Sequence, residues 1–298
     1  MSNNNLIILI TGASTGLGRL TAKKCLQSGH IVIITGRSEQ RIKEAKQWIL
    51  QDSSPQHESR LHGITMDLLD VASMKKAVQV LGTLVSSIDV IVHNAGGLNP
   101  KFSQTYNFED TVFMNAVAPL YLNQLLLPFI EKSQHPLKRI IFVASQIHNA
   151  EINDGTGELR NISEDVQLDE LTGNKETWDT VKYYRLSKLA LIWGVLALIP
   201  QLESTKVILM CPGYVPTTDL ARHSRHLVDK DVDSPHATSQ DESTDAYIYL
   251  ITSPDIKSGS YYRKKELTSV SNDALNKRKQ QEFYQLVQKA IQSISCQY

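Results

Sequence analysis

Short runs of apolar residues, many of them β-branched, alternate with longer segments along the chain. Each run is apolar throughout, which is the pattern of a parallel strand that is covered on both faces. The longer segments place their apolar residues at helical spacing. Strand and helix in strict alternation predict an α/β fold with a doubly wound, mostly parallel sheet and helices on both faces. The predicted strands are residues 6–11, 31–35, 61–66, 88–93, 139–145 and 206–211, and the predicted helices include 16–28, 38–51, 70–85 and 107–132.

Two connections are longer than the loops that usually join strands and helices, which is typical of lids and ligand-binding loops. Residues 146–182 form a polar insertion with nine acidic and three basic residues. Residues 214–245 form a second long connection, which we expect to bind substrate. A final strand in SGSYY, residues 258–262, brings the predicted sheet to about seven strands. No linker separates two cores, so the sequence predicts a single domain over residues 1–298.

The charge balance argues against two classes of partner. The chain has 31 basic and 31 acidic residues, so it offers no electrostatic footprint for nucleic acid or for an anionic membrane surface. Lys277, Arg278 and Lys279 form a local basic cluster, which we interpret as a solvated helix face. No apolar run reaches the roughly 20 residues that cross a bilayer, so we expect no integral membrane segment.

Cysteine usage and histidine spacing indicate neither disulfides nor a metal. Cys25, Cys211 and Cys296 lie far apart and form no CxxC pair, so we expect reduced thiols in a cytoplasmic protein. His223 and His226 have the i, i+3 spacing of a metal pair. No third ligand is evident beside them, and we predict no metal site.

The first predicted strand is followed by the glycine-rich sequence TGASTGLG, residues 11–18. Glycines permit a tight turn there, and free N–H groups at the start of the next helix point at a pyrophosphate. In the first strand–helix unit of a parallel sheet, this sequence predicts dinucleotide binding. The turn residues expected to contact the dinucleotide are Gly12, Ser14, Thr15, Gly16, Leu17 and Gly18.

The end of the second predicted strand indicates which dinucleotide is bound. Enzymes that use NAD usually carry Asp or Glu at this place, where the carboxylate accepts from the ribose hydroxyls. This chain has Gly36 and Arg37 there instead. No carboxylate repels a 2′-phosphate, and a guanidinium holds a phosphate bidentately. The sequence therefore predicts NADP(H).

Residues 179–191, DTVKYYRLSKLAL, contain two adjacent tyrosines and a lysine. In a helix, Tyr184 and Lys188 lie about 40° apart on one face, whereas Tyr183 is about 140° from Lys188 and is expected in the core or in the pocket wall. A phenol with a pKa of about 10 is a poor base near neutrality. A nearby ammonium, together with the charge of an oxidised nicotinamide, favours phenolate and lowers that pKa. Tyr184 is thus the predicted general acid and base, and Lys188 its activator.

The GxxxGxG spacing of the turn, the sequence HNAG at 93–96 and YxxxK after the fifth strand make the chain resemble the short-chain dehydrogenase/reductase family over nearly its whole length. The resemblance implies a Rossmann fold. It also implies that Asn115 kinks its helix and carries a water, and that Lys188 holds the nicotinamide ribose. The catalytic set that it implies is Asn115, Ser145, Tyr184 and Lys188. The further cofactor contacts that it implies are Ser14, Asp67, Leu68, Asn94, Ala95, Gly96, Tyr184, Lys188, Pro212, Gly213, Val215 and Thr217.

The insertion at 146–182 and the sequence after residue 258 resemble the retinol-dehydrogenase and protochlorophyllide-reductase-like branch of that family. The implied activity is NADP(H)-dependent interconversion of a carbonyl and an alcohol on a lipophilic or secondary-metabolite-like small molecule. His148 follows Ser145 closely and is a candidate for the substrate pocket. Members of the family often form homodimers through the helices that hold Asn115 and Tyr184, so a homodimer is one expectation.

Two other functions are compatible with a dinucleotide turn. A non-catalytic, NADP-binding regulator would sense redox state through its partners. An epimerase or dehydratase would use the cofactor only transiently. Regulators of this kind usually lack the tyrosine or the lysine, and this chain has both. The epimerase and dehydratase relatives usually prefer NAD and have longer C-terminal substrate domains, whereas this chain has Arg37 and a short tail after Pro212.

Overall fold

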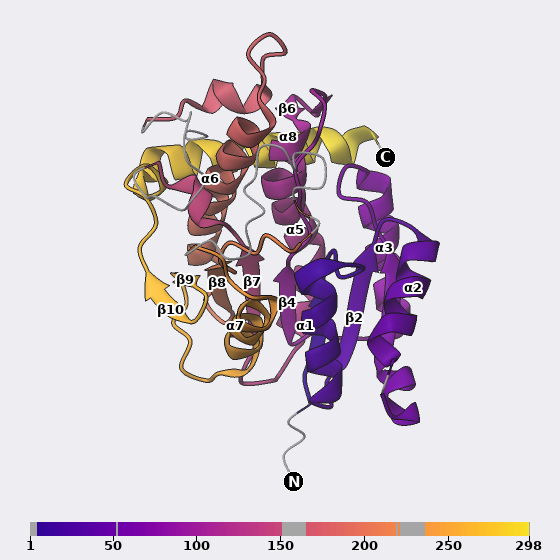
Figure 1. Cartoon of the computed structure of the whole chain (residues 1–298). Coiled ribbons are helices and arrows are strands. Elements are labelled where there is room, and N and C mark those ends of the chain that lie inside the picture. Colours follow the sequence, from indigo (N-terminus) through magenta and orange to yellow (C-terminus); the bar gives the residue numbers. More distant parts are fainter. Residues whose placement is uncertain (1–4, 52, 151–164, 219, 221–235, 298) are drawn as a thin grey trace.

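The computed structural model describes residues 5–51, 53–150, 165–218, 220 and 236–297. The strands of its main sheet are β1 (Ile7–Ile10), β2 (Ile31–Gly36), β3 (Leu61–Thr65), β4 (Val90–His93), β7 (Arg139–Val143), β8 (Lys206–Cys211), β9 (Ser260–Arg263) and β10 (Glu266–Thr268). Their order across the sheet is β10-β9-β8-β7-β4-β1-β2-β3 (Figure 1). All neighbours in this order are parallel except β9 and β10. The predicted doubly wound, mostly parallel sheet is confirmed.

The sheet has eight strands, one more than the sequence predicted. The additional strand, β10, follows β9 through a tight turn in which Lys264 has φ 56°. All three residues of β10 are exposed, so the sequence contains no apolar run that would predict this strand. The two-residue strands β5 (Gln104–Thr105) and β6 (Phe108–Glu109) form a separate antiparallel pair. They were missed because two residues are too few to show a strand pattern.

The long helices are α1 (Gly16–Gln27), α2 (Glu39–Leu50), α3 (Val71–Leu84), α5 (Ala118–Glu131), α6 (Thr180–Leu198), α7 (Gln240–Thr252) and α8 (Lys277–Gln297). Shorter elements are α4 (Asp110–Val112) and the 3-10 turns Pro55–Arg60, Gln146–His148, Leu168–Thr172, Ile199–Gln201 and Asp273–Leu275. Side chains of Ser38, Asp70 and Asp179 accept from backbone N–H groups and cap α2, α3 and α6, which fixes where these helices begin.

The predicted helix over 107–132 is interrupted. It begins at Asp110, and residues Phe113–Val117 form a π-helical turn between α4 and α5. A π turn inserts one extra residue and often marks a functional site. Residue Asn115 lies in its middle, so the kink that the family resemblance implied is present.

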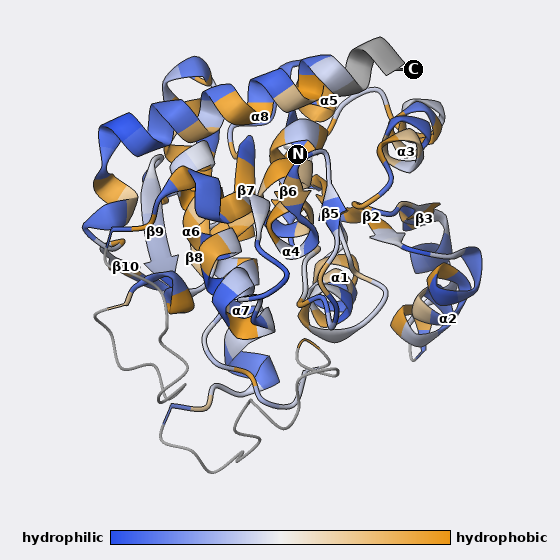
Figure 2. Ribbon diagram, turned by 90° about the horizontal axis from the view of Figure 1, so that it is seen from above, coloured by the Kyte–Doolittle hydropathy of each residue, from blue (hydrophilic) through white to orange (hydrophobic). Residues whose placement is uncertain are grey.

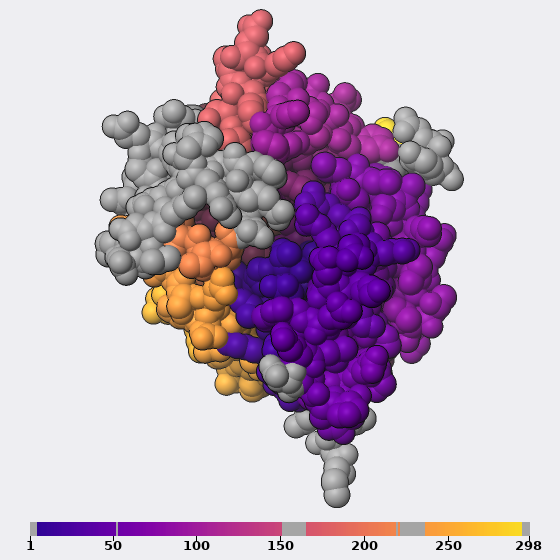
Figure 3. All heavy atoms as spheres, turned by 45° about the vertical axis from the view of Figure 1, so that its right-hand side comes forward, coloured from indigo at the N-terminus to yellow at the C-terminus, as the bar shows by residue number. Residues whose placement is uncertain are grey.

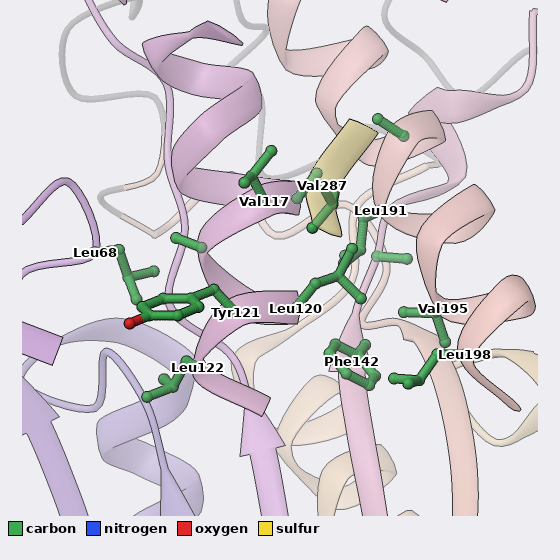
Figure 4. Close-up of a cluster of buried hydrophobic side chains, with 14 of the residues drawn as sticks. Leu68, Val117, Leu120, Tyr121, Leu122, Phe142, Leu191, Val195, Leu198 and Val287 are labelled. Carbon is green, nitrogen blue, oxygen red and sulfur yellow. The ribbon is translucent and has the colours of Figure 1, made fainter. Parts of the chain in front are cut away.

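The sheet is covered on both faces by apolar side chains. One face packs against α3, α5, α6 and α8, and the other against α1, α2 and α7. Leu120, Phe142, Leu191 and Val287 meet in the first layer (Figure 4). In Figure 2 the hydrophobic strands β7 and β8 lie in the middle of the molecule, between helices that carry hydrophilic residues.

Segments that are distant in sequence meet beside the sheet. Lys24 on α1 pairs with Asp245 on α7 at 2.8 Å, and Figure 3 shows the indigo and orange surfaces next to each other. One helical stretch, Asp110–Glu131, is long and apolar enough to cross a membrane by length and composition, and 67% of its most apolar window is buried inside the fold. It contacts β4 and α6, as a core helix does.

The basic cluster of the C-terminal helix is a solvated face only in part, because Lys277 and Arg278 are exposed as predicted whereas Lys279 is buried. The side chain of Lys279 is 3% exposed and lies 2.5 Å from Asp273 and 2.6 Å from Asp165. Trp193 on α6 donates to the backbone carbonyl of Asp273 at 2.9 Å. Lys279 thus fastens α8 to the turn that precedes it and to Asp165 within the insertion.

Candidate active site

A cavity of about 570 Å³ lies at the carboxyl ends of the parallel strands. Parallel α/β sheets bind ligands at this edge, near the point where the strand order reverses, and here β1 and β4 are adjacent across that point. The predicted site residues that line the cavity are Gly12, Ser14, Thr15, Gly16, Leu17, Gly18, Arg37, Asp67, Leu68, Asn94, Ala95, Gly96, Ser145, Tyr184, Lys188, Pro212, Gly213 and Val215. Only Asn115 and Thr217 of the predicted set do not.

The glycine-rich turn after β1 is shaped for a phosphate. Gly12 has φ 63°, and a Cβ atom on it would lie 2.7 Å from the Cα of Ala95, so a larger residue would both strain the turn and collide with the next loop. The side chain of Asn94 donates to the Thr11 carbonyl at 2.8 Å and holds the two loops together. No acidic residue lies in the first turn of α1, which leaves its N–H groups and positive dipole end available to an anion.

Tyr247 is a contributor to this turn that the sequence did not reveal. Its hydroxyl donates to Asn94 Oδ1 at 2.9 Å, and its ring is buried between α7 and the sheet. The residue lies far along the chain from the motif that it supports. No local pattern connects the two positions, and only the approach of α7 to α1 brings them together.

The end of β2 carries two arginines. Arg37 and Arg41 both line the cavity, four residues apart at the start of α2. Ser14 is close to them, because a Cβ atom on Gly36 would lie 3.0 Å from the Ser14 Cβ. Arg41 was missed in the sequence, because it lies on α2 whereas Arg37 precedes the cap of that helix. Hydroxyl and guanidinium groups in this arrangement suit a phosphate monoester.

The catalytic candidates lie at the end of β7. Tyr184 is 8% exposed and Lys188 5% exposed, and the Lys188 Nζ lies 5.6 Å from the centre of the Tyr184 ring. Lys188 Nζ donates to the carbonyl of Val143, the last residue of β7, at 2.9 Å. Ser145 forms a side-chain hydrogen bond with Tyr184. Two hydroxyl groups and an amine therefore converge on one point of the cavity.

Burial dominates the electrostatics of Tyr184 and Lys188. Burial raises the pKa of its phenol, the proximity of Cys211 adds to the rise, and the hydrogen bond with Ser145 opposes it. Burial also lowers the pKa of Lys188 to about 8. Loss of hydration disfavours the charged form of both groups. Tyr184 is consequently held as the protonated phenol, which is the form that donates a proton.

Asn115 does not line the cavity but bonds to residues that position it. Its Nδ2 donates to the Gly97 carbonyl at 2.8 Å and to Ser187 Oγ at 2.9 Å, and its Oδ1 accepts from the Gly97 N–H at 2.9 Å. Ser187 Oγ in turn donates to the Tyr184 carbonyl at 2.7 Å. The asparagine therefore fixes the loop after β4 to the helix that carries Tyr184.

The loop after β8 departs from the expected residue at one position. Thr217 does not line the cavity, and its hydroxyl accepts from Gln240 Nε2 at 3.1 Å. The neighbouring Thr218 lines the cavity instead. Part of this loop, with His223 and His226, and part of the insertion lie outside the described residues.

Tyr183 and the cysteines behave as core residues. Tyr183 is 2% exposed, and its hydroxyl accepts from the Asn174 N–H at 3.3 Å. Cys25 and Cys211 are free and buried. Across the described part of the chain, no group of three His, Cys, Asp or Glu side chains is placed to hold a metal ion.

His148 does not reach the cavity but braces the catalytic serine. It is 2% exposed, and its Nδ1 lies 2.7 Å from the Ser145 carbonyl while its Nε2 accepts from the Ser271 N–H at 3.1 Å. This pair of contacts needs a neutral ring that is protonated at Nδ1. Burial, together with the charge of Arg185, lowers the pKa of His148 to about 4, against a hydrogen bond to Ser145 that raises it.

Acid should weaken the protein through this histidine. Its folded pKa lies below the unfolded value of about 6.5, so the unfolded chain binds the proton more readily. Stability should therefore fall as the pH drops from about 6.5 to about 4, by up to about 3 kcal/mol for this one residue. Urea unfolding of wild type and His148→Gln at several pH values checks this.

The His148→Gln protein should show a shallower loss of stability in the same window. His93, whose pKa burial also lowers to about 4, remains in both proteins, so the difference between the two curves isolates His148. If the unfolding free energies of the two proteins fell in parallel with pH, the pKa of His148 would not be lowered in the folded protein.

The wall beside Tyr184 is apolar. Ile147, Val181 and Tyr184 form a small buried cluster, with Leu98 packed against it, and all four residues line the cavity. A ligand whose reacting atom lies at Ser145 and Tyr184 would place its neighbouring carbon atoms against this wall.

Comparison with known proteins agrees with this geometry. A profile of the short chain dehydrogenase family matches residues 6–156. The chain is 30% identical over 274 residues to mouse retinol dehydrogenase 14, and the aligned part covers 86% of this chain and 76% of that protein. It is 28% identical over 226 residues to the 3-oxoacyl-(acyl-carrier-protein) reductase FabG of Aquifex aeolicus, and the aligned part covers 75% of this chain and 79% of that protein.

Solved structures share the fold. The Pseudomonas aeruginosa RhlG/NADP active-site complex superposes with a TM-score of 0.65 at 20% identity, over 87% of this chain and 94% of that one. The oxidoreductase yciK of E. coli gives a TM-score of 0.64 at 20% identity, over 89% and 99%. Fold, catalytic geometry and sequence comparison agree, and the chain belongs to the short chain dehydrogenase family of oxidoreductases, with likeness to its retinol dehydrogenase branch.

Proposed function

We propose that the protein is an NADP(H)-dependent oxidoreductase that interconverts a carbonyl and an alcohol on a small, lipophilic molecule. The observation that carries the proposal is the joining of two sites in one cavity. Ser14 in the turn after β1 lies beside the segment after β2 that carries Arg37 and Arg41, and Ser145, Tyr184 and Lys188 gather at the end of β7. The first set suits a 2′-phosphate and the second set suits proton transfer to an alkoxide.

The residues of the glycine-rich turn would hold the pyrophosphate, and Lys188 would hold the nicotinamide ribose. When bound, the nicotinamide supplies or accepts the hydride. Ser145 and Tyr184 place two hydroxyl donors where the carbonyl oxygen of the substrate is bound. Both donors strengthen their hydrogen bonds as negative charge develops on that oxygen.

Tyr184 then gives its phenolic proton to the oxygen in the reductive direction and accepts it in the oxidative direction. Its raised pKa favours the phenol, which is the form that donates the proton in reduction. Lys188, with a pKa of about 8, gains or loses a proton close to that pH and is suited to restore the proton of the phenol. Asn115 keeps the helix of Tyr184 in register through Ser187.

Neither alternative function has a separate observation in its favour. A regulator that only binds the dinucleotide has no need of a buried lysine beside a Ser145–Tyr184 hydrogen bond. Such groups are costly to bury and are kept where they perform chemistry.

Cofactor choice is tested at Arg37. We expect Arg37→Asp to weaken NADPH binding by on the order of 100-fold or more, because a charge-assisted, bidentate contact is replaced by a repelling carboxylate. NADH binding should stay the same or improve. Fluorescence titration of both cofactors measures the two dissociation constants.

Lys43→Gln is the matched control, because Lys43 is exposed on α2, the helix that follows Arg37, and does not line the cavity. It should change neither dissociation constant. Equal affinity of the wild type for NADH and NADPH would contradict the assignment of the 2′-phosphate site to this end of the cavity.

A further inference from the structure

Arg263 is a cation in the cavity that the proposed chemistry does not use. It is the last residue of β9 and lines the same cavity as Tyr184. Its Nε is buried without a hydrogen-bond partner, and its guanidinium pairs with no carboxylate in the described part of the chain. A guanidinium that is partly withdrawn from water and left without a partner is unfavourable. A bound anion would remove that cost.

The position of Arg263 along its strand sets the side of the sheet that it faces. Side chains alternate between the two faces of a strand. Tyr261 belongs to the core layer that contains α5 and α6, and Tyr262 belongs to the opposite layer. Arg263 follows Tyr261 by two positions and therefore faces the layer of α6, the helix that carries Tyr184.

The width of the sheet separates Arg263 from the nucleotide end of the cavity. Strands β8, β7, β4 and β1 lie between β9 and β2, which at about 4.8 Å per strand puts Arg263 about 24 Å from the β2 end with its phosphate-binding arginines. The glycine-rich turn of β1 is about 19 Å away by the same measure. Both distances exceed the reach of an arginine side chain.

The catalytic hydroxyl groups lie nearer to Arg263 than the nucleotide turn does. Ser145 follows β7, two strands from β9, or about 10 Å along the edge of the sheet. Arg263 thus stands beyond the catalytic hydroxyl groups as seen from the nucleotide turn. A ligand that reaches Arg263 from Ser145 is the substrate.

We propose that Arg263 binds a carboxylate of the substrate, so that the site takes oxo acids and the corresponding hydroxy acids. The reacting carbonyl lies at Ser145 and Tyr184, an apolar chain packs against Leu98, Ile147 and Val181, and the carboxylate pairs with the guanidinium. Arginine matches a carboxylate bidentately. The inference rests on the proposed function, because it takes the Ser145–Tyr184 pair as the place of the carbonyl.

Medium-chain oxo acids and their methyl esters provide the test, since the two members of each pair differ by the negative charge and by one methyl group. We expect wild type to show a KM for the acid about 10- to 100-fold below that for the ester, as one charge-assisted contact provides. In Arg263→Gln the ratio should fall toward one, and Arg263→Lys should restore part of it. Lys265→Gln, which alters an exposed lysine outside the cavity, should keep the wild-type ratio.

Three results would overturn the proposal, and each differs from failure of the proposed function. One is equal turnover of acids and esters by wild type. Another is a loss of NADPH affinity in Arg263→Gln with the acid-to-ester ratio unchanged, which would assign the arginine to the cofactor. If neither acid nor ester reacts, the proposed function fails, and titration of unreactive octanoate into the NADP⁺-saturated protein decides on Arg263. Weaker octanoate binding by Arg263→Gln supports the subsite, and equal binding overturns it.

Discussion

We expect Tyr184→Phe to lower kcat for carbonyl reduction by about 10²- to 10⁴-fold, the usual contribution of a positioned general acid. The substitution removes one oxygen atom from a buried ring and leaves its apolar contacts with Ile147 and Val181 in place. NADPH affinity should change little by comparison. Steady-state NADPH oxidation with the aldehyde or ketone that wild type reduces best, together with fluorescence titration of NADPH, measures both quantities.

Tyr183→Phe is a matched control in the adjacent position. Its hydroxyl accepts from the Asn174 N–H and does not reach the cavity. Loss of that hydrogen bond should cost about 1 kcal/mol of unfolding free energy and leave kcat near the wild-type value. If Tyr184→Phe kept most of its activity, or if both variants lost it equally, the proton would have to come from another group.

The second large effect concerns stability. We expect Lys279→Met to lower the free energy of unfolding by about 3–5 kcal/mol, because it leaves a carboxylate without its partner. The side chain of Asp273 is 8% exposed and lies 2.5 Å from Lys279 Nζ. Methionine fills the same volume beside Trp193, so lost packing adds little. Urea unfolding followed by tryptophan fluorescence measures the loss.

Arg278→Met provides the comparison on the same helix. Arg278 is 72% exposed and faces Glu282 at 3.7 Å, and such surface pairs contribute about 0.3–0.5 kcal/mol. The double variant Lys279→Met/Asp273→Leu should recover much of the loss, since neither charge is then left alone. A loss for Lys279→Met no greater than that for Arg278→Met would mean that Asp273 finds water once its partner is gone.

The fold was readable from the sequence because burial on both sides leaves a strong pattern. The predicted runs at 31–35 and 206–211 correspond to β2 and β8, and the predicted helices at 16–28 and 70–85 end within about one residue of α1 and α3. Caps such as Asp70 mark these helix starts in the sequence itself. Strand β10, which is exposed throughout, had no such pattern and was missed.

The site was readable only in part. The glycine-rich turn and the Tyr184–Lys188 pair are local in sequence, so spacing reveals them. The partners of His148 are a carbonyl near it in sequence and a backbone N–H far along the chain, and no spacing rule links them. The raised pKa of Tyr184 was also missed, because it depends on how completely the fold excludes water from a ring. Tertiary approach and burial are not properties of short sequence patterns.

The bond between His148 and Ser271 has a consequence for the order in which the protein is completed during synthesis. Its two residues are 123 positions apart, so at about 5–20 residues per second the ribosome adds the second roughly 6–25 s after the first. The glycine-rich turn, Arg37 and the first parallel strands emerge earlier and can pair with one another during that interval. The residues of the glycine-rich turn and Arg37 are thus on the growing chain well before the contact that braces the catalytic serine can form.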